Sequence, residues 1–154
     1  MNRFAGLIAV FFGAGLLPKA PGTWGSLAAL PLAWLIHGWG GAPWLAGATA
    51  VLFIIGVWAS SVHGRRLGRD DPGEIVVDEV AGQWLTLLVV PADLLLYALG
   101  FVLFRFFDIV KPWPVSWADR RIKGGVGIMF DDILAGVYAA LGLLLLRYLL
   151  GIEV

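Results

Sequence analysis

Residues 104–132 read FRFFDIVKPWPVSWADRRIKGGVGIMFDD and stand between two apolar stretches of the chain. Lys111 opens a KPWP motif whose two prolines lack an N–H and disfavour helical geometry in the preceding residue, so a helix is expected to end there. Asp131 and Asp132 come where the next apolar stretch begins. We therefore expect them in a first helical turn, where the helix dipole favours carboxylates. The stretch predicts two helices joined by a turn-forming connector.

The same stretch concentrates charge. Arg105 and Asp108 are three residues apart, so they share one face of the first helix. Helix capping accounts well for one aspartate, but less well for the Asp131–Asp132 pair together with Asp108 and two cations. Arg105 and Lys111 have two interpretations, which are binding of a substrate phosphate and a structural ladder of ion pairs with Asp108. The stretch is thus a candidate functional site.

The composition is that of a membrane protein. The chain has 154 residues, of which 60% are hydrophobic and 14% charged, and its mean hydropathy is +0.86. A soluble domain has only about 45–50% apolar residues. The formal net charge is zero, which argues against a nucleic-acid partner. The absence of cysteine excludes disulfides, thiolate nucleophiles and zinc–thiolate sites.

Six apolar runs predict an all-α, multi-helical integral membrane bundle of five or six helices in a single domain, residues 1–154. Alternation typical of a membrane barrel is missing, and helices are the other way to satisfy backbone groups in lipid. The first two runs are short, so they either span as a packed pair or form a re-entrant hairpin that turns at residues 18–22. The runs lie at about 4–17, 24–37, 43–62, 75–91, 94–110 and 128–150.

Charges in the connectors predict the orientation. Lysine and arginine occur in the connectors at 18–22, 63–73 and 111–127, and are missing from those at 38–43 and 91–93. Under the positive-inside rule the first group faces the cytoplasm, and the candidate site with it. His63, in a basic connector, is expected to be a surface residue. We therefore expect a multi-pass protein of the bacterial plasma (inner) membrane with its active site on the cytoplasmic face.

A second acidic motif opens the fourth apolar run, where residues 70–83 read DDPGEIVVDEVAGQ. An ionised side chain costs about 2.5–3.5 kcal/mol at the centre of a spanning helix, so Asp78 and Glu79 mark a candidate site. Glu79, Gln83 and Thr86 follow at helical spacing on one face. A structural hydrogen-bond network between helices would use the same stripe.

The acidic residues together predict a metal site. They map to the same ends of three successive spans, and carboxylates so close would repel unless a cation joined them. Hard oxygen ligands without cysteine or clustered histidine favour Mg²⁺, which usually takes one or two carboxylates and a substrate phosphate. With two cations nearby, this pattern favours a phosphate ester as substrate. The candidate catalytic residues are Asp78, Glu79, Asp108, Asp131 and Asp132.

Two glycine-containing motifs are open to simpler interpretations. Residues 21–26 read PGTWGS, so Thr23 and Ser26 are candidates to bind a phosphate, while Thr23 could equally be a plain helix N-cap. Residues 124–127 read GGVG and are interpreted as a flexible connector. Small residues such as Gly82 and Gly136 are expected to let helices pack closely.

Taken together, the motifs resemble the bacterial phosphatidylglycerophosphatase A family. The resemblance rests on their order over about residues 6–140. It implies a Mg²⁺-dependent lipid phosphatase that converts phosphatidylglycerophosphate to phosphatidylglycerol and phosphate. Six carboxylates match acidic positions of the family pattern, and the resemblance does not settle which of them bind metal. We predict Asp78, Glu79, Asp131 and Asp132 as the metal ligands, with Asp71 and Asp108 as further candidates. The motifs are PGTWGS at 21–26, IVVDE at 75–79 with Gly82, FR at 104–105 with Asp108, KPWP at 111–114 and GIMFDD at 127–132.

Two other function classes stay open at this point. A small membrane transporter would also bury carboxylates, although near the bilayer midplane, and a non-catalytic membrane-assembly subunit would release no phosphate. Aspartyl- and histidine-nucleophile phosphatase patterns are both missing, which favours direct attack by metal-activated water. The sequence leaves the oligomeric state undetermined.

Overall fold

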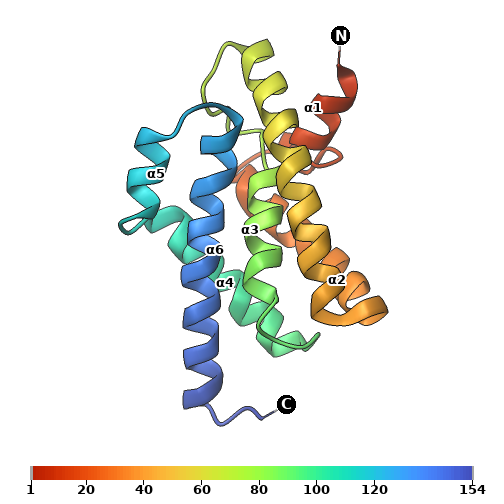
Figure 1. Cartoon of the computed structure of the whole chain (residues 1–154), viewed down its shortest axis with the longest axis vertical. Helices are drawn as coiled ribbons and strands as arrows, with labels where there is room; N and C mark the ends of the chain where they lie inside the picture. The colour runs from red at the N-terminus through yellow and green to blue at the C-terminus, as the bar shows by residue number, and fades with distance from the viewer. Residues whose placement is uncertain (1, 154) are drawn as a thin grey trace.

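The computed structural model describes residues 2–153, and helices are joined there by turns and loops (Figure 1). The described part of the chain contains no strand, which confirms the all-α prediction. Its elements are α1 (Arg3–Ala9), the 3-10 helix η1 (Ala14–Leu16), α2 (Pro21–Leu67), α3 (Val77–Leu87), α4 (Leu94–Val110), α5 (Val115–Arg121) and α6 (Gly124–Leu149).

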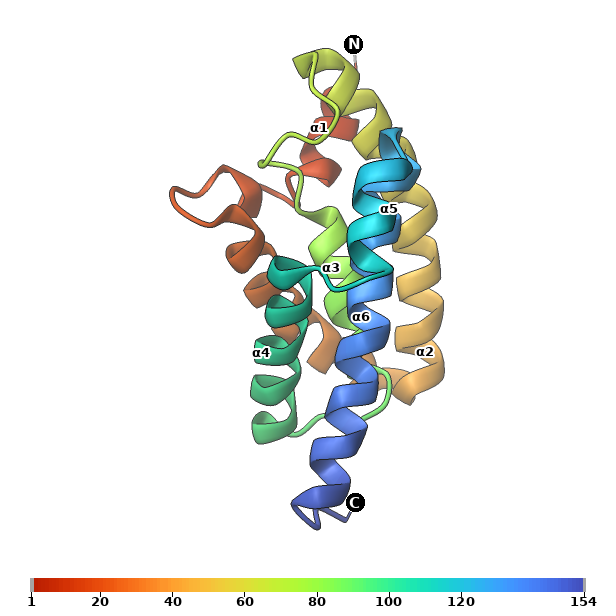
Figure 2. The same cartoon turned by 90° about the vertical axis from the view of Figure 1, so that its left-hand side faces the viewer.

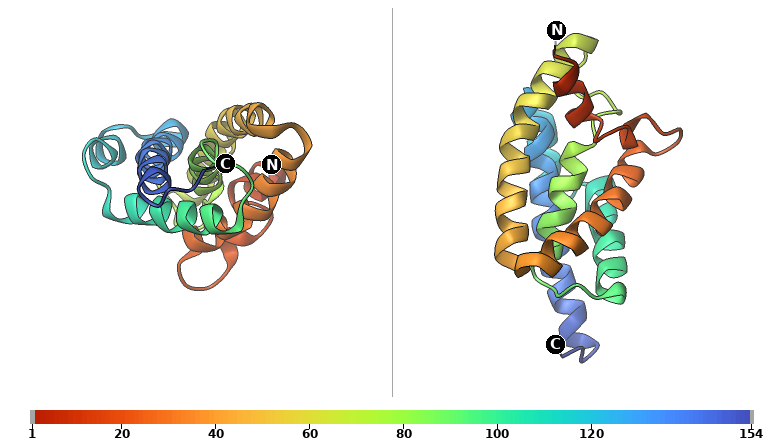
Figure 3. Two further views of the ribbon diagram at one scale, coloured as in Figure 1. Left: turned by 90° about the horizontal axis from the view of Figure 1, so that it is seen from below. Right: turned by 90° about the vertical axis from the view of Figure 1, so that its right-hand side faces the viewer.

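The second and third apolar runs form one bent element. Helix α2 is interrupted at Gly41, whose φ of 71° and ψ of −165° are not helical. This glycine divides α2 into a first limb, residues 21–40, and a second limb, residues 42–67, which fold back at an angle (Figure 3). The connector expected near residues 38–43 is therefore a sharp bend.

Within residues 2–153, two helices are long and apolar enough to cross a membrane, namely α2 and α6. Helix α3 has 11 residues and α4 has 17, against about 20 for a full span. The structure thus supports association with a membrane.

The first apolar run does not form a spanning helix. Helix α1 has seven residues and is about 10 Å long, far below the thickness of the hydrocarbon core. Residues 10–20 form turns and η1, because Phe11, Phe12 and Gly13 adopt positive φ. This segment projects from the bundle (Figure 2). It carries exposed Phe12 and Leu16.

Helix α3 is the centre of the bundle and packs against both α2 and α6, while α4 and α5 pack against α6. Glycines make the α3–α6 contact close. A Cβ atom at Gly136 would lie 2.7 Å from the Gly82 carbonyl oxygen, and one at Gly82 would lie 2.6 Å from that of Asp132. The expected packing role of these small residues is confirmed, and it sets the distance between the acidic residues of α3 and α6.

The connector after α4 differs from the prediction. Helix α4 ends at Val110, as the prolines require, but residues 115–121 form α5 and bury Val115 and Ala118 against the bundle. Helix α6 begins at Gly124, so the GGVG segment is helical. Its amides pack onto α2, since the Gly125 N–H donates to Ser61 Oγ at 3.1 Å. Tertiary packing here outweighs the weak helix propensity of glycine.

The first residues of α6 and α2 correct two interpretations made from the sequence. Asp131 and Asp132 lie about two turns inside α6, so they are not first-turn capping residues. Thr23 is not an N-cap either, because α2 begins at Pro21 with Ala20 as its N-cap.

His63 also differs from the prediction. It lies in α2 and is 7% exposed, rather than on the surface of a loop. Its Nε2 lies 2.5 Å from Glu74 Oε1, so this pair ties the end of α2 to the segment that leads into α3.

Candidate metal and phosphate site

Three helices carry the acidic residues to one region of the bundle. Asp78 and Glu79 are in the first turn of α3, Asp108 is in the last turn of α4, and Asp131 and Asp132 lie about two turns into α6. The four aspartates are at most 7% exposed. The predicted convergence of these side chains is therefore observed.

Asp78, Glu79 and Asp132 form a compact group that we call the carboxylate trio. One oxygen from each lies within 4.8 Å of the others, a geometry that could hold a metal ion. Asp78 Oδ1, Glu79 Oε2 and Asp132 Oδ2 are each buried without a hydrogen-bond partner among residues 2–153. Unpartnered buried carboxylate oxygens are costly, and a divalent cation would satisfy all three, so the trio fits a metal.

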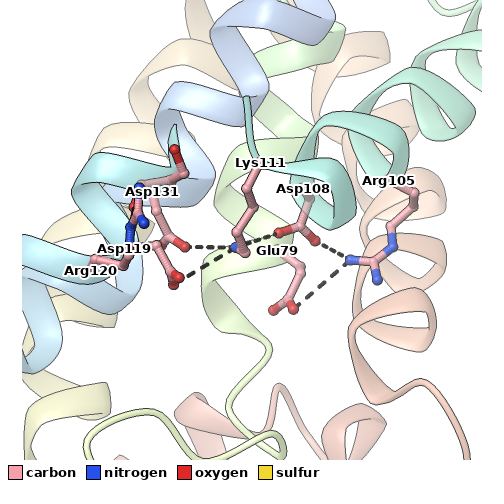
Figure 4. A network of polar contacts seen from close by, with 8 residues as sticks. Glu79, Arg105, Asp108, Lys111, Asp119, Arg120 and Asp131 are labelled. Carbon is pink, nitrogen blue, oxygen red and sulfur yellow. Dashed lines mark hydrogen bonds and ion pairs between the residues drawn. The ribbon is translucent and has the colours of Figure 1, made fainter. Parts of the chain in front are cut away.

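Lys111 holds the neighbouring acidic residues instead (Figure 4). Its Nζ donates to Asp131 Oδ2 at 2.9 Å and lies 3.5 Å from Asp108 Oδ1 and 3.9 Å from Asp119 Oδ1. Sequence reasoning missed Asp119, because it lies in α5, within the segment expected to be a connector. Asp119 follows buried Val115 by four residues, a helical spacing. This spacing would have indicated Asp119 only if helix α5 had been predicted.

Arg105 joins α4 to α3 and to the start of α2. Its Nη1 donates to Asp108 Oδ2 and lies 4.0 Å from Glu79 Oε1. The spacing that predicted a shared face for Arg105 and Asp108 is confirmed. A Cβ atom at Gly22 would lie 2.5 Å from Glu79 Oε1 and 3.0 Å from Arg105 Nη1, so a larger residue there would displace the ends of these two side chains.

The remaining candidate residues make fewer contacts with the rest of the site. Thr23 and Ser26 lie on the first two turns of α2, next to Gly22. Ser26 is fully buried and its hydroxyl has no partner within the described range, while Thr23 is partly buried. Neither makes a side-chain hydrogen bond to Arg105 or Lys111. Asp71 is not part of the trio and lines a cavity of about 30 Å³ with Asp119 and Lys123.

Two groups outside the long helices have perturbed pKa values. Burial lowers the pKa of the Lys111 ammonium group, but the charges of Asp131, Asp132 and Asp108 outweigh it and raise the pKa above its ordinary value. Lys111 is therefore a permanent cation. Much of Asp71 is exposed, yet desolvation within the small cavity and then repulsion from Asp119 raise its pKa.

Comparison with known proteins identifies the family. The family model described as phosphatidylglycerophosphatase A matches residues 7–147, a range that includes every acidic residue of the site. The chain belongs to this family.

Curated relatives agree with the assignment. Phosphatidylglycerophosphatase A of Escherichia coli (strain K12) is 46% identical over 137 residues, or 87% of this chain and 78% of the relative. The protein of that name from Haemophilus influenzae is 39% identical and covers 92% of this chain and 88% of its own length. A putative phosphatidylinositol-3-phosphatase of Bacteroides thetaiotaomicron is 40% identical, with 94% of both chains covered. No solved structure matches the chain.

Proposed function

We propose that this protein is a Mg²⁺-dependent phosphatase that removes the terminal phosphate of phosphatidylglycerophosphate to give phosphatidylglycerol. The carboxylate trio is the observation that carries the proposal, since its three unpartnered oxygens lie close enough together to hold a cation. Family membership supports a phosphatase acting on a phospholipid. Mg²⁺ is proposed because every ligand is a hard oxygen and the described chain places no histidine in the trio.

We assign different roles to the residues of the site. Asp78, Glu79 and Asp132 hold the ion, which when bound supplies a Lewis acid and lowers the pKa of a coordinated water. Asp131 and Asp108 orient Lys111, and Asp108 orients Arg105.

Arg105 and Lys111 are proposed to neutralise the non-bridging oxygens of the phosphate. Their side chains keep 15% and 29% exposure, so a ligand can reach them. Thr23 and Ser26 lie at the N-terminal end of α2 beside Arg105, and a helix N-terminus favours a phosphate group. No side chain here resembles a phospho-enzyme nucleophile of the usual kinds, so we propose direct attack by water.

We also propose that the protein acts as a single domain in the bacterial plasma membrane, with this site facing the cytoplasm. The arginine-rich end of α2 and the lysine-containing connectors support that orientation. Gly73→Cys and Gly38→Cys test it, because both positions are exposed and have open space around a new Cβ atom.

In intact cells, a membrane-impermeant thiol reagent should label Gly38→Cys and leave Gly73→Cys unlabelled until the cells are lysed. The chain has no cysteine of its own, so the background is low. Labelling in the reverse pattern contradicts the orientation.

Phosphate release tests the function directly. Purified protein in detergent should release phosphate from phosphatidylglycerophosphate with Mg²⁺, stop in excess chelator and recover on addition of Mg²⁺. Release without any divalent metal, with bound metal excluded by elemental analysis, contradicts the metal proposal. No release under any metal condition would favour the transporter or assembly-subunit alternatives.

A second substrate belongs in the same assay. One relative is named for phosphatidylinositol 3-phosphate, so this lipid should be compared at equal concentration. Faster release from it than from phosphatidylglycerophosphate would reassign the substrate while leaving the metal site unchanged.

A further inference from the structure

An apolar groove runs along the contact between the first limb of α2 and α4. It has a volume of about 510 Å³ and is lined by Leu30, Trp34, Leu94, Tyr97 and Ala98, among others. Trp34 and Tyr97 meet edge to face across it, with ring centroids 5.3 Å apart. Its size is within the roughly 300–1,000 Å³ of small-molecule sites. Nothing in the lining is charged.

The groove and the candidate site lie along the same two helices. At their other end, Gly22 of α2 meets Arg105 of α4. Ala98 precedes Arg105 by seven residues, so the two share a face of α4 and are about 10 Å apart along its axis. A headgroup layer is roughly 5–8 Å thick on each side of a bilayer. With Arg105 at the level of the headgroups, the groove therefore lies at the level of the acyl chains.

We propose that this α2–α4 groove binds an acyl chain of the phospholipid substrate while its terminal phosphate reaches Arg105 and the carboxylate trio. This inference rests on the proposed function and deepens it, because it makes the diacyl part of the substrate a second recognition element. The phosphate is drawn to the cations at one end, and at the other end the acyl chain gains van der Waals contacts with the lining of the groove, because packing is what favours contact between apolar groups within lipid.

A second apolar groove supplies the matched control. It has a volume of about 760 Å³ and is lined by Trp39, Trp44, Gly47 and Val51 near the bend of α2. Its lining lies on α2 between residues 36 and 55, on both sides of the bend, with Trp84 of α3, and no residue of it belongs to α4, which carries Arg105. The bend lies at the end of the bundle opposite α1 (Figure 1). Filling this groove should therefore leave recognition of the substrate unchanged.

The experiment compares two variants on two substrates. Ala98→Leu fills the first groove from an exposed position, and Gly47→Leu fills the second, where a new Cβ atom meets open space. The substrates are dipalmitoyl phosphatidylglycerophosphate and its acyl-free analogue, glycerophosphoglycerol phosphate. We expect Ala98→Leu to lower the ratio of kcat/KM for the diacyl lipid to that for the analogue by about tenfold. Gly47→Leu should leave the ratio unchanged. An unchanged ratio in folded Ala98→Leu, or an equal fall in Gly47→Leu, overturns the proposal.

Photolabelling of the wild-type protein tests, without a variant, whether the α2–α4 groove binds an acyl chain. A phosphatidylglycerophosphate with a diazirine at mid-chain, irradiated in chelator, should label residues 30–35 and 94–98. Labelling mainly at 39–55 overturns the groove proposal. Absence of phosphate release from either substrate in the wild type would contradict the proposed function instead, and the labelled positions would still report on the groove.

Discussion

The two parts of the acidic site differ in how their charge is balanced. Asp108 and Asp131 are paired with Arg105 or Lys111. In the carboxylate trio, Glu79 has an ion-pair contact with Arg105 at 4.0 Å, and no ion pair within residues 2–153 involves Asp78 or Asp132. The same kinds of acidic residue therefore have different surroundings in the two parts of the site. The paired acids contact and orient cations, whereas the trio keeps oxygens free, as a metal site would need.

This difference has an electrostatic reason. A buried carboxylate without a partner carries a desolvation cost that a hydrogen-bond donor, a proton or a nearby positive charge can offset. Lysine and arginine provide that charge in the paired part. In the trio we propose that a bound cation provides it, so binding of the cation should be lost when any one member is changed.

The largest expected effect comes from changing the trio. Asp78→Asn, Glu79→Gln or Asp132→Asn keeps the side-chain shape and removes the charge that holds the ion. We expect turnover to fall by more than about 10³-fold, beyond the roughly 10²–10³-fold typical of a single oriented donor. Calorimetric titration with Mg²⁺ should show lost binding in protein that is still folded. Wild-type rates in these variants would show that the metal site is elsewhere.

A smaller loss is expected from the cations. Arg105→Lys keeps the charge but removes the bidentate geometry, and we expect kcat to fall on the order of 10²–10³-fold with metal affinity retained. Lys111→Gln is the companion variant. Phosphate release must be expressed per folded molecule, because a purely structural ladder would lower the melting temperature and leave specific activity unchanged. That second result in both variants would return Arg105 and Lys111 to a structural role.

Asp131→Asn should have an intermediate effect that separates the two parts of the site. Loss of the charged hydrogen bond to Lys111 Nζ is expected to lower kcat by about 10- to 100-fold, because such bonds contribute roughly 1.5–3 kcal/mol. Mg²⁺ affinity should stay close to that of the wild type. If affinity falls as far as in Asp132→Asn, then Asp131 is a metal ligand, as predicted from the sequence, and the division between paired and unpaired acids is wrong.

The smallest effect is expected at Asp93, an acidic residue outside both parts. Its carboxylate accepts a hydrogen bond from the Leu96 N–H at 2.9 Å and caps α4. Asparagine caps helices about as well as aspartate. Asp93→Asn should therefore keep both activity and melting temperature near the wild-type values, which makes it the charge-matched control for the other variants. A loss comparable to that of Arg105→Lys would show that any acidic change disturbs the enzyme.

Much of the site could be predicted from local spacing. The Arg105–Asp108 contact follows from an i, i+3 separation, and the end of α4 follows from the KPWP motif. Helix α5 and the early start of α6 could not be predicted in this way, because glycine and proline weaken the local helix signal. Their helical structure depends on packing, because α5 packs against α6 and the start of α6 packs against α2, through contacts such as Gly125 with Ser61. Asp119 was missed for the same reason.

The sequence by itself determined that the chain is helical and apolar, which family it belongs to and which acidic residues gather on α3, α4 and α6. These properties follow from composition, short-range periodicity and ordered motifs, all of which are carried by residues close together in the chain. Only the tertiary structure decided which carboxylates are paired and which are free. That division depends on how closely helices cross, through contacts such as Gly82 with Gly136 and Gly22 with Glu79, and no local pattern encodes the distance between side chains on separate helices.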